Sequence, residues 1–267
     1  MPIADIGNGE LHYEIHGEGP PLMLVAGLGG TADYWNAQIE AFAKDYMVVV
    51  HDHRGTGQST HSEIDYSVDQ MTEDLSRLMD FLNIDRAHIV GHSTGAAMAI
   101  VLAVKAPERL SSAVIYAGWT KADPQMSRCF DVRRALLRDS GVQAYARATP
   151  LFLFPPWFIR DHGQAMIEHE PNAVAALPSA MIMESRMDAV LAFDCTDYIG
   201  AVGVPSLVIC AEDDFLTPAY FSRELVELIP GAELNIIENG GHAVSVTRPE
   251  LFNEAVLAFL DRQALPS

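Results

Sequence analysis

The feature that most constrains this chain is the segment 87–98, a short apolar run that ends in Gly-x-Ser-x-Gly and continues into small, helix-forming residues. β-Branched residues before the motif favour a strand, and the alanine-rich stretch 96–103 favours a helix after it. Gly91 and Gly95 leave room for the chain to reverse sharply between the two elements. Alone the motif could be a chance glycine-serine turn, but this context predicts a strand, a tight turn and a helix, with Ser93 isolated at the turn.

Length and composition allow one large globular α/β domain or one domain that carries an insertion. The chain has 267 residues, of which 49% are hydrophobic, enough for a sizeable core. No basic start precedes an apolar run, and no apolar segment approaches the roughly 18 residues of a membrane helix, so we expect a cytoplasmic protein. The three cysteines lack C-x-x-C spacing. Neither a disulfide framework nor a metal site is therefore expected.

The formal net charge of −19 makes nucleic acids and anionic membranes poor partners, because both would be repelled. A small-molecule substrate remains the expected partner, and a homodimer is left open. The charge is uneven, since the window 121–160 holds seven basic and three acidic residues. That window is chemically distinct from the rest of the chain.

Strands and helices alternate along most of the chain, which predicts a mostly parallel sheet with helices on both faces. A hairpin at 3–15 is expected at one edge of the sheet. Between 120 and 198 no buried strand is predicted. Asp123-Pro124 is typical of a helix start and Ser140-Gly141 of a stop, and five prolines should break the rest into short helices. The sequence thus predicts a core of residues 1–120 and 199–267 with a helical cap at 121–198.

A serine hydroxyl is a weak nucleophile near neutral pH, so Ser93 needs a base and a carboxylate that orients the base. Both follow predicted strands further along the chain, at the edge where open α/β sheets build their sites. His242 follows one strand. The acidic run 212–214 follows another, and any of its three residues could be the acid, with Asp123 a remoter alternative.

The remaining site predictions concern charge stabilisation and substrate contact. The glycine-rich turn 27–30 follows a strand, so the N–H groups of Leu28 and Thr94 are expected to face developing negative charge. His92 is expected to pack on the turn. Aromatic residues of the cap could line a pocket or fill the cap's own core, and its least compensated arginines could bind a substrate carboxylate or merely solvate the cap. These candidates are Trp119, Phe154, Trp157, Arg128, Arg133 and Arg147.

Together the motifs at 27–30, 52–59, 91–95, 214–218 and 240–242 resemble those of the α/β-hydrolase superfamily from end to end. The stretches 26–30, 118–119, 128–130 and 150–155 are further similar to the aminoacrylate hydrolases of bacterial pyrimidine utilisation and their enol-lactonase relatives. The resemblance implies an α/β-hydrolase fold, no cofactor, and Asp214 as the acid, since the family places it four residues before a proline. One departure is Ala26, where many members have histidine.

These observations lead to a serine hydrolase that acts on a small ester, enol-lactone, amide or aminoacrylate-like metabolite, and the cationic window favours a substrate with a carboxylate. The fold also hosts ligand-sensing receptors with little turnover and carbon–carbon bond hydrolases, which are the alternatives. A complete Ser93, Asp214 and His242 set favours the enzyme.

Overall fold

The computed structural model describes residues 2–263. Its centre is an eight-stranded sheet in the order β1-β2-β4-β3-β5-β6-β7-β8. Strands β3 to β8 run parallel, whereas β2 pairs antiparallel with both β1 and β4, as the predicted edge hairpin requires. The strands are β1 (Ile3–Asp5), β2 (Glu10–His16), β3 (Pro21–Val25), β4 (Met47–His51), β5 (Ala87–His92), β6 (Leu110–Tyr116), β7 (Ser206–Ala211) and β8 (Glu233–Ile237).

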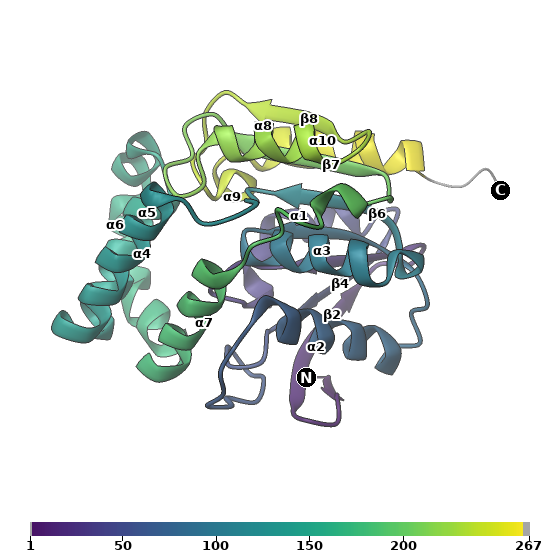
Figure 1. Cartoon of the computed structure of the whole chain (residues 1–267). Helices are drawn as coiled ribbons and strands as arrows, with labels where there is room; N and C mark the ends of the chain where they lie inside the picture. Colours follow the sequence, from purple (N-terminus) through teal and green to yellow (C-terminus); the bar gives the residue numbers. More distant parts are fainter. Residues whose placement is uncertain (1, 264–267) are drawn as a thin grey trace.

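Two hydrophobic cores lie on opposite faces of the sheet. Successive side chains of a strand alternate between faces, so in β3 Met23 and Val25 enter one core while Leu22 and Leu24 enter the other. Helices α2 (Val68–Phe81), α3 (Thr94–Lys105) and α8 (Ala219–Leu228) cover the first face. Helices α1 (Asn36–Phe42) and α10 (Pro249–Gln263) cover the second (Figure 1).

Four short helical segments connect the larger elements. They are η1 (Ala32–Trp35), η2 (Pro107–Arg109), η4 (Ile199–Ala201) and α9 (Val244–Thr247). Ser67 caps the start of α2, because its side chain accepts the N–H of Gln70. Within residues 2–263, no helix is long and apolar enough to cross a membrane.

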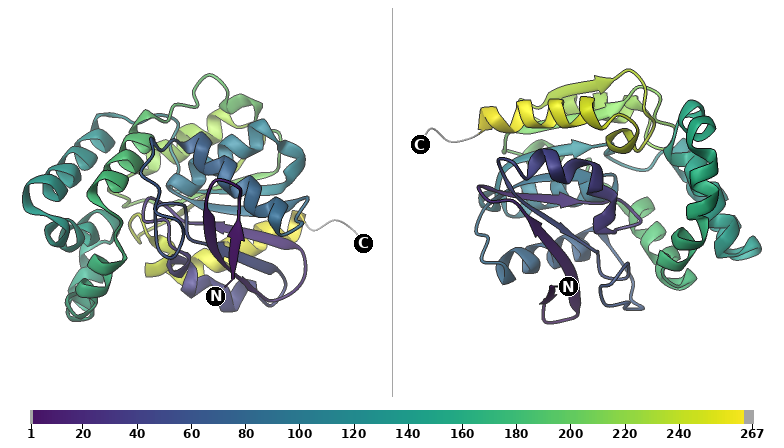
Figure 2. Two further views of the ribbon diagram at one scale, coloured as in Figure 1. Left: turned by 90° about the horizontal axis from the view of Figure 1, so that it is seen from below. Right: turned by 180° about the vertical axis from the view of Figure 1, so that it is seen from behind.

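Four helices form a layer beyond the carboxyl ends of the parallel strands (Figure 2). They are α4 (Pro124–Ala135), α5 (Val142–Leu153), α6 (Pro156–Ala176) and α7 (Ala180–Ala192), with the π-helical turn η3 (Leu136–Ser140) after α4. Asp123 caps α4 by accepting the N–H of Met126 at 2.8 Å. Gly141, with φ of 84°, follows η3. Both were expected from the sequence.

The expectation that every proline breaks this region into short helices was wrong at two positions. Pro150 lies inside α5, and Pro171 lies inside the 21-residue α6. A proline removes one backbone donor and leaves the carbonyl four residues earlier without a partner. At Pro171 that carbonyl belongs to Ile167, and both residues are exposed, so water can reach it. Pro155, Pro156 and Pro178 do stand at helix boundaries.

We predict that Gly95→Ala lowers the free energy of unfolding by about 3 kcal/mol, because a methyl group there overpacks a tightly packed contact. Its Cβ would lie 2.2 Å from the carbonyl oxygen of Val25. Gly163→Ala in α6 is the control, since a Cβ there meets nothing within 4 Å; it should raise stability by up to about 1 kcal/mol. Urea unfolding measures both. A Gly95→Ala midpoint equal to that of the parent would contradict the prediction.

Candidate active site

Ser93 lies in a backbone conformation that few non-glycine residues adopt, with φ of 53° and ψ of −112°. It occupies the single position between the end of β5 and the start of α3. Its N–H donates to the carbonyl of Tyr116 at 2.8 Å, and its own carbonyl accepts the N–H groups of Ala96 and Ala97. These bonds fix the turn and leave the Ser93 hydroxyl on the wall of a cavity of about 530 Å³.

The two motif glycines make this turn sterically feasible. A Cβ on Gly91 would lie 2.1 Å from the carbonyl oxygen of Gly95, and one on Gly95 would press against β3. Because both positions lack a side chain, α3 starts directly against the sheet. The turn therefore places Ser93 beside the loop that follows β3.

His242 and Asp214 form a buried hydrogen-bonded pair next to the same cavity. The ring Nδ1 lies 2.9 Å from Asp214 Oδ2, and the two side chains are 2% and 0% exposed. Since a carboxylate accepts, Nδ1 carries the hydrogen and Nε2 is left as the basic nitrogen. Asp214 Oδ1 also accepts the N–H groups of Leu216 and Thr217, which fixes the carboxylate.

Ser93 and His242 both line the cavity, whereas Asp214 lies behind the histidine. Among residues 2–263 no hydrogen bond joins the Ser93 hydroxyl to another side chain. Such bonds are often long before a substrate is bound. The arrangement offers a hydroxyl, a ring base and an orienting carboxylate in the spatial order that nucleophilic catalysis uses.

The loop that carries His242 is fixed by groups other than Asp214. Asp213 was one of the three residues that could have been the acid, but its Oδ1 accepts the N–H groups of Gly240 and Gly241, each at 2.8 Å. The Tyr116 hydroxyl donates to the carbonyl of His242 at 2.9 Å. Asp213 therefore orients the backbone that carries the histidine.

His92 packs on the turn, as expected, and also contacts the His242 loop. Its ring stacks on Tyr34 with centroids 4.6 Å apart, and its Nε2 lies 3.1 Å from the carbonyl of His242. Burial holds the pKa of His92 well below its usual range, so the ring is neutral and Nε2–H donates this bond. His92 thus supports the site without titrating near neutral pH.

Two backbone N–H groups were predicted to face developing negative charge. Leu28 carries one in the glycine-rich loop after β3, and Thr94 carries the other at the start of α3. Thr94 is the first residue of α3, where a helical N–H has no intrahelical partner. Neither its N–H nor that of Leu28 donates to another residue within 2–263. Leu28 lines the cavity, whereas Thr94 follows the cavity-lining Ser93.

Arg186 of α7 holds this loop through hydrogen bonds to its backbone, a role that was not predicted from the sequence. It is fully buried, and its Nε and Nη2 donate to the carbonyl of Leu28 at 3.2 and 3.0 Å. Nη1 donates to the carbonyl of Arg54, and Nη2 lies 3.1 Å from His53 Nδ1. Burial lowers the pKa of Arg186 to about 10, so it stays charged at neutral pH. One cation therefore connects α7 to the loops that follow β3 and β4.

Among the residues predicted to contact substrate, Arg133 is a buried residue that lines the cavity. It lines the cavity although it is only 5% exposed. Its Nη2 donates to the Tyr145 hydroxyl at 2.6 Å, its Nε has no hydrogen-bond partner, and no described carboxylate pairs with it. The rings of Phe130, Tyr145 and Phe152 lie 5.2 to 5.6 Å from its guanidinium carbon. Among the described residues, Arg133 is thus a buried cation without a paired carboxylate.

The other predicted contact residues divide between the cavity and its surroundings. Phe154 and Arg147 line the cavity, but Arg147 is exposed and already pairs with Glu170 of α6 at 2.8 Å. Arg128 is exposed and lies outside the cavity. The two tryptophans are also outside it: Trp119 packs against Phe193, and Trp157 lies under Arg248.

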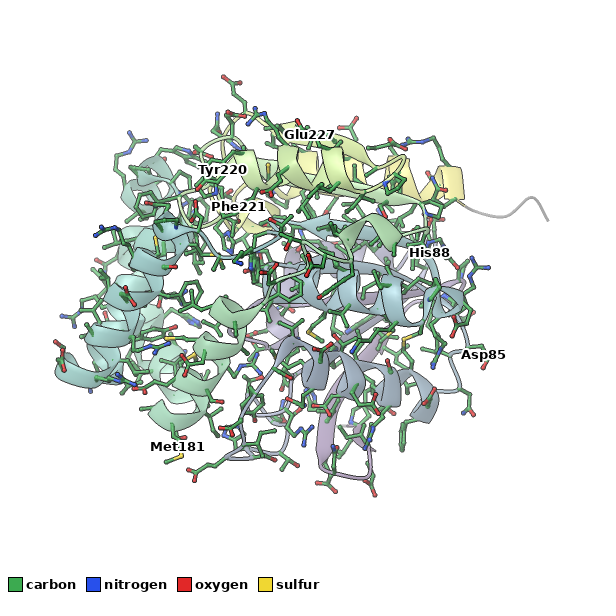
Figure 3. The ribbon with its side chains drawn as sticks, viewed as in Figure 1. Asp85, His88, Met181, Tyr220, Phe221 and Glu227 are labelled. Carbon is green, nitrogen blue, oxygen red and sulfur yellow. The ribbon has the colours of Figure 1, made fainter. Side chains whose placement is uncertain are left out.

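Salt bridges join two helices of the four-helix layer, α4 with its turn η3 and α7. Arg134 and Arg138 pair with Asp188 and Glu184 of α7, rather than with aspartates on their own helix. Tyr220 lies at the start of α8 (Figure 3). Its hydroxyl donates to Asp123, the residue before α4, and so joins α4 to α8. Within the described residues, no group of three or more His, Cys, Asp or Glu side chains is arranged to hold a metal ion.

The supporting roles of Arg186 and Asp213 were not predicted from the sequence, although the position of each residue gave a signal. Arg186 occupies the buried stripe of α7 that also includes Ile182, Met183 and Val190, and a charged residue in such a stripe usually has a buried partner. Asp213 precedes the predicted acid directly. Its contacts to Gly240 and Gly241 depend on the pairing of β7 with β8, which the sequence does not specify.

Comparison with known proteins assigns the chain to a family. The sequence profile of the α/β hydrolase fold family matches residues 20–249, so the chain belongs to that family and is a hydrolase. Within it, the chain is 42% identical over 259 residues to a protein of Azorhizobium caulinodans that bears the name carbamate hydrolase RutD. The match covers 97% of this chain and 98% of the relative. A Caulobacter protein of the same name is 41% identical, with 95% and 97% coverage.

Solved structures agree with this assignment. The enol-lactonase of Burkholderia xenovorans superposes with a TM-score of 0.89 at 27% identity, and the match covers 97% of this chain and all of that one. The α/β hydrolase MGS-M2 from a deep-sea metagenome gives 0.90 at 26% identity, covering 100% and 99%. The fold expected from the sequence is therefore confirmed.

We predict different consequences for the two neighbouring aspartates. Asp214→Asn should lower kcat by about 10³- to 10⁴-fold, because the amide favours the wrong ring tautomer. Asp213→Ala should lower kcat about tenfold by loosening the His242 loop, while Asp213→Asn keeps an acceptor oxygen and should restore most of it. Turnover of p-nitrophenyl acetate measures all three. A large loss of kcat in Asp213→Asn together with a small loss in Asp214→Asn would show that Asp213, and not Asp214, orients His242.

Proposed function

We propose that the protein is a serine hydrolase that uses Ser93, His242 and Asp214 on a small ester, lactone, amide or carbamate-like metabolite that bears a carboxylate. The observation that carries the proposal is the Asp214–His242 pair, which leaves a basic Nε2 at the cavity that the Ser93 hydroxyl also lines. The names of the relatives, a carbamate hydrolase and an enol-lactonase, support cleavage of a carbonyl–heteroatom bond.

In the first step Ser93 Oγ attacks the substrate carbonyl carbon while His242 Nε2 takes the hydroxyl proton. Asp214 accepts a hydrogen bond from Nδ1 and stabilises the imidazolium that forms. The carbonyl oxygen becomes an oxyanion that the N–H groups of Leu28 and Thr94 would bind, since neither has another partner within 2–263.

In the second step the tetrahedral intermediate expels its leaving group, which receives the proton from His242 Nε2. The acyl group remains on Ser93 as an ester. Water then attacks that ester, with His242 again as the base, and releases the acid. Each step uses the same three side chains and needs no further reactant than water.

Arg133 is the group we assign to the substrate's carboxylate. A buried cation without an anionic partner is costly, and the three aromatic rings around it compensate only partly. A carboxylate from the substrate would neutralise this charge and accept hydrogen bonds from the guanidinium where it lines the cavity. This assignment selects one arginine from the three that the sequence offered.

We expect Arg133→Met to lower kcat/KM about a hundredfold for monomethyl succinate, which carries a carboxylate, and far less for dimethyl succinate. The methionine keeps an unbranched apolar side chain and removes the charge. Arg128→Met, on the same helix but exposed, should change the ratio between the two substrates less than about twofold.

Ser93→Ala should abolish turnover of both esters, which shows that the measured rate comes from this site. Equal losses on the charged and neutral esters in Arg133→Met would mean that Arg133 only supports the cap. Persistent turnover in Ser93→Ala would overturn the proposed function itself.

A further inference from the structure

We propose that the cavity contains a chamber for an aliphatic chain, and that the preferred substrates are esters, lactones or amides with a straight acyl chain of about six to eight carbons. This inference rests on the proposed function, because it concerns the substrate of the same serine. It goes beyond the names of the relatives, one of which acts on a carbamate by name.

The first observation is size. The cavity has a volume of about 530 Å³, within the range of pockets that enclose drug-sized ligands. A carbamate has four non-hydrogen atoms and would occupy on the order of 100 Å³, since a water molecule takes about 30 Å³ in the liquid. Most of the cavity would then be empty or filled by water.

The second observation is the chemistry of the wall. Helices α5 and α6, together with the residue that follows α6, contribute a set of apolar side chains that we call the aliphatic chamber. They are Ala146, Ile159, Met166, Ile167, Ala173 and Leu177. Water gains little from such a surface because it finds few hydrogen-bond partners there. A hydrocarbon chain, by contrast, gains free energy in proportion to the apolar area that it covers.

The third observation is the entrance. Leu151 and Ile167 line the cavity yet are 65% and 64% exposed. Large apolar side chains that are both exposed and continuous with a cavity are typical of ligand-binding grooves. Two charged residues on this part of the wall, Arg147 and Glu170, pair with each other at 2.8 Å.

The chamber has a quantitative consequence for specificity. Each methylene moved from water into an apolar environment contributes about fourfold to kcat/KM when the transition state buries it. Four added methylenes, from an acetyl to a hexanoyl group, should therefore raise kcat/KM at least tenfold even if burial is incomplete. A neutral straight chain tests the chamber without involving Arg133.

The first experiment measures kcat/KM of the wild-type protein on p-nitrophenyl acetate, butanoate, hexanoate and octanoate below their solubility limits. We expect a steady rise to hexanoate or octanoate, with hexanoate at least tenfold above acetate. Values that stay flat or fall with chain length would overturn the chamber and leave the proposed function intact.

The second experiment fills the chamber. Ala173→Phe places a ring on its wall and should lower the hexanoate-to-acetate ratio at least tenfold. Ala175→Phe makes the same change two residues later on α6, at an exposed position outside the cavity, and should keep the wild-type ratio. Identical ratios in both variants would overturn the assignment of these residues.

The third experiment separates the chamber from the catalytic mechanism. Ser93→Ala protein is titrated with acetamide, butanamide, hexanamide and octanamide by calorimetry. We expect affinity to increase about fourfold per methylene, whether or not the wild type turns over any ester. If no ester is hydrolysed but affinity increases, the proposed function fails and the chamber stands; affinity independent of chain length overturns the chamber.

Discussion

The close approach of α3 to the sheet is the constraint on which the site depends. Gly95 lies against the carbonyl of Val25, and Gly91 lies against Gly95, at distances that no Cβ could occupy. The chain can therefore turn within one residue, and Ser93 takes the strain with a φ of 53°. Because the neighbouring parallel strands end at the same edge, the loops after β3, β7 and β8 meet this serine.

Each of these loops is held by a charged side chain that bonds to backbone groups. Asp214 accepts two N–H groups of its own turn, and Asp213 accepts two from the His242 loop. Arg186 donates to the carbonyl of Leu28 and also reaches the loop at residue 54. Asp214 and Arg186 are buried, and buried charges are costly unless their bonding is satisfied, so each fixes its loop to one geometry, whereas Asp213 acts from an exposed position. The same scheme leaves Arg133 unsatisfied, which is why we assign it to substrate.

The sequence was sufficient for the sheet and for the order of the site residues, since apolar runs, glycines and strand ends are local signals. It was insufficient where partners come from another helix. Arg147 looked uncompensated in sequence, but Glu170 lies opposite it in α6, while Arg133 found no carboxylate. The prediction that Pro150 and Pro171 break helices failed for a similar reason. Whether a proline breaks a helix depends on what surrounds the carbonyl that it leaves without a partner. The division into core and cap at 121–198 remains a prediction.

The central claim is that Ser93 is the activated nucleophile, and covalent labelling tests it most directly. A fluorophosphonate probe should add its mass to the peptide that contains Ser93, stop turnover, and label neither Ser93→Ala nor, at comparable rate, His242→Ala. Peptide mass spectrometry after digestion locates the modification. Stoichiometric labelling of another residue, with loss of activity and Ser93 unmodified, would contradict the account.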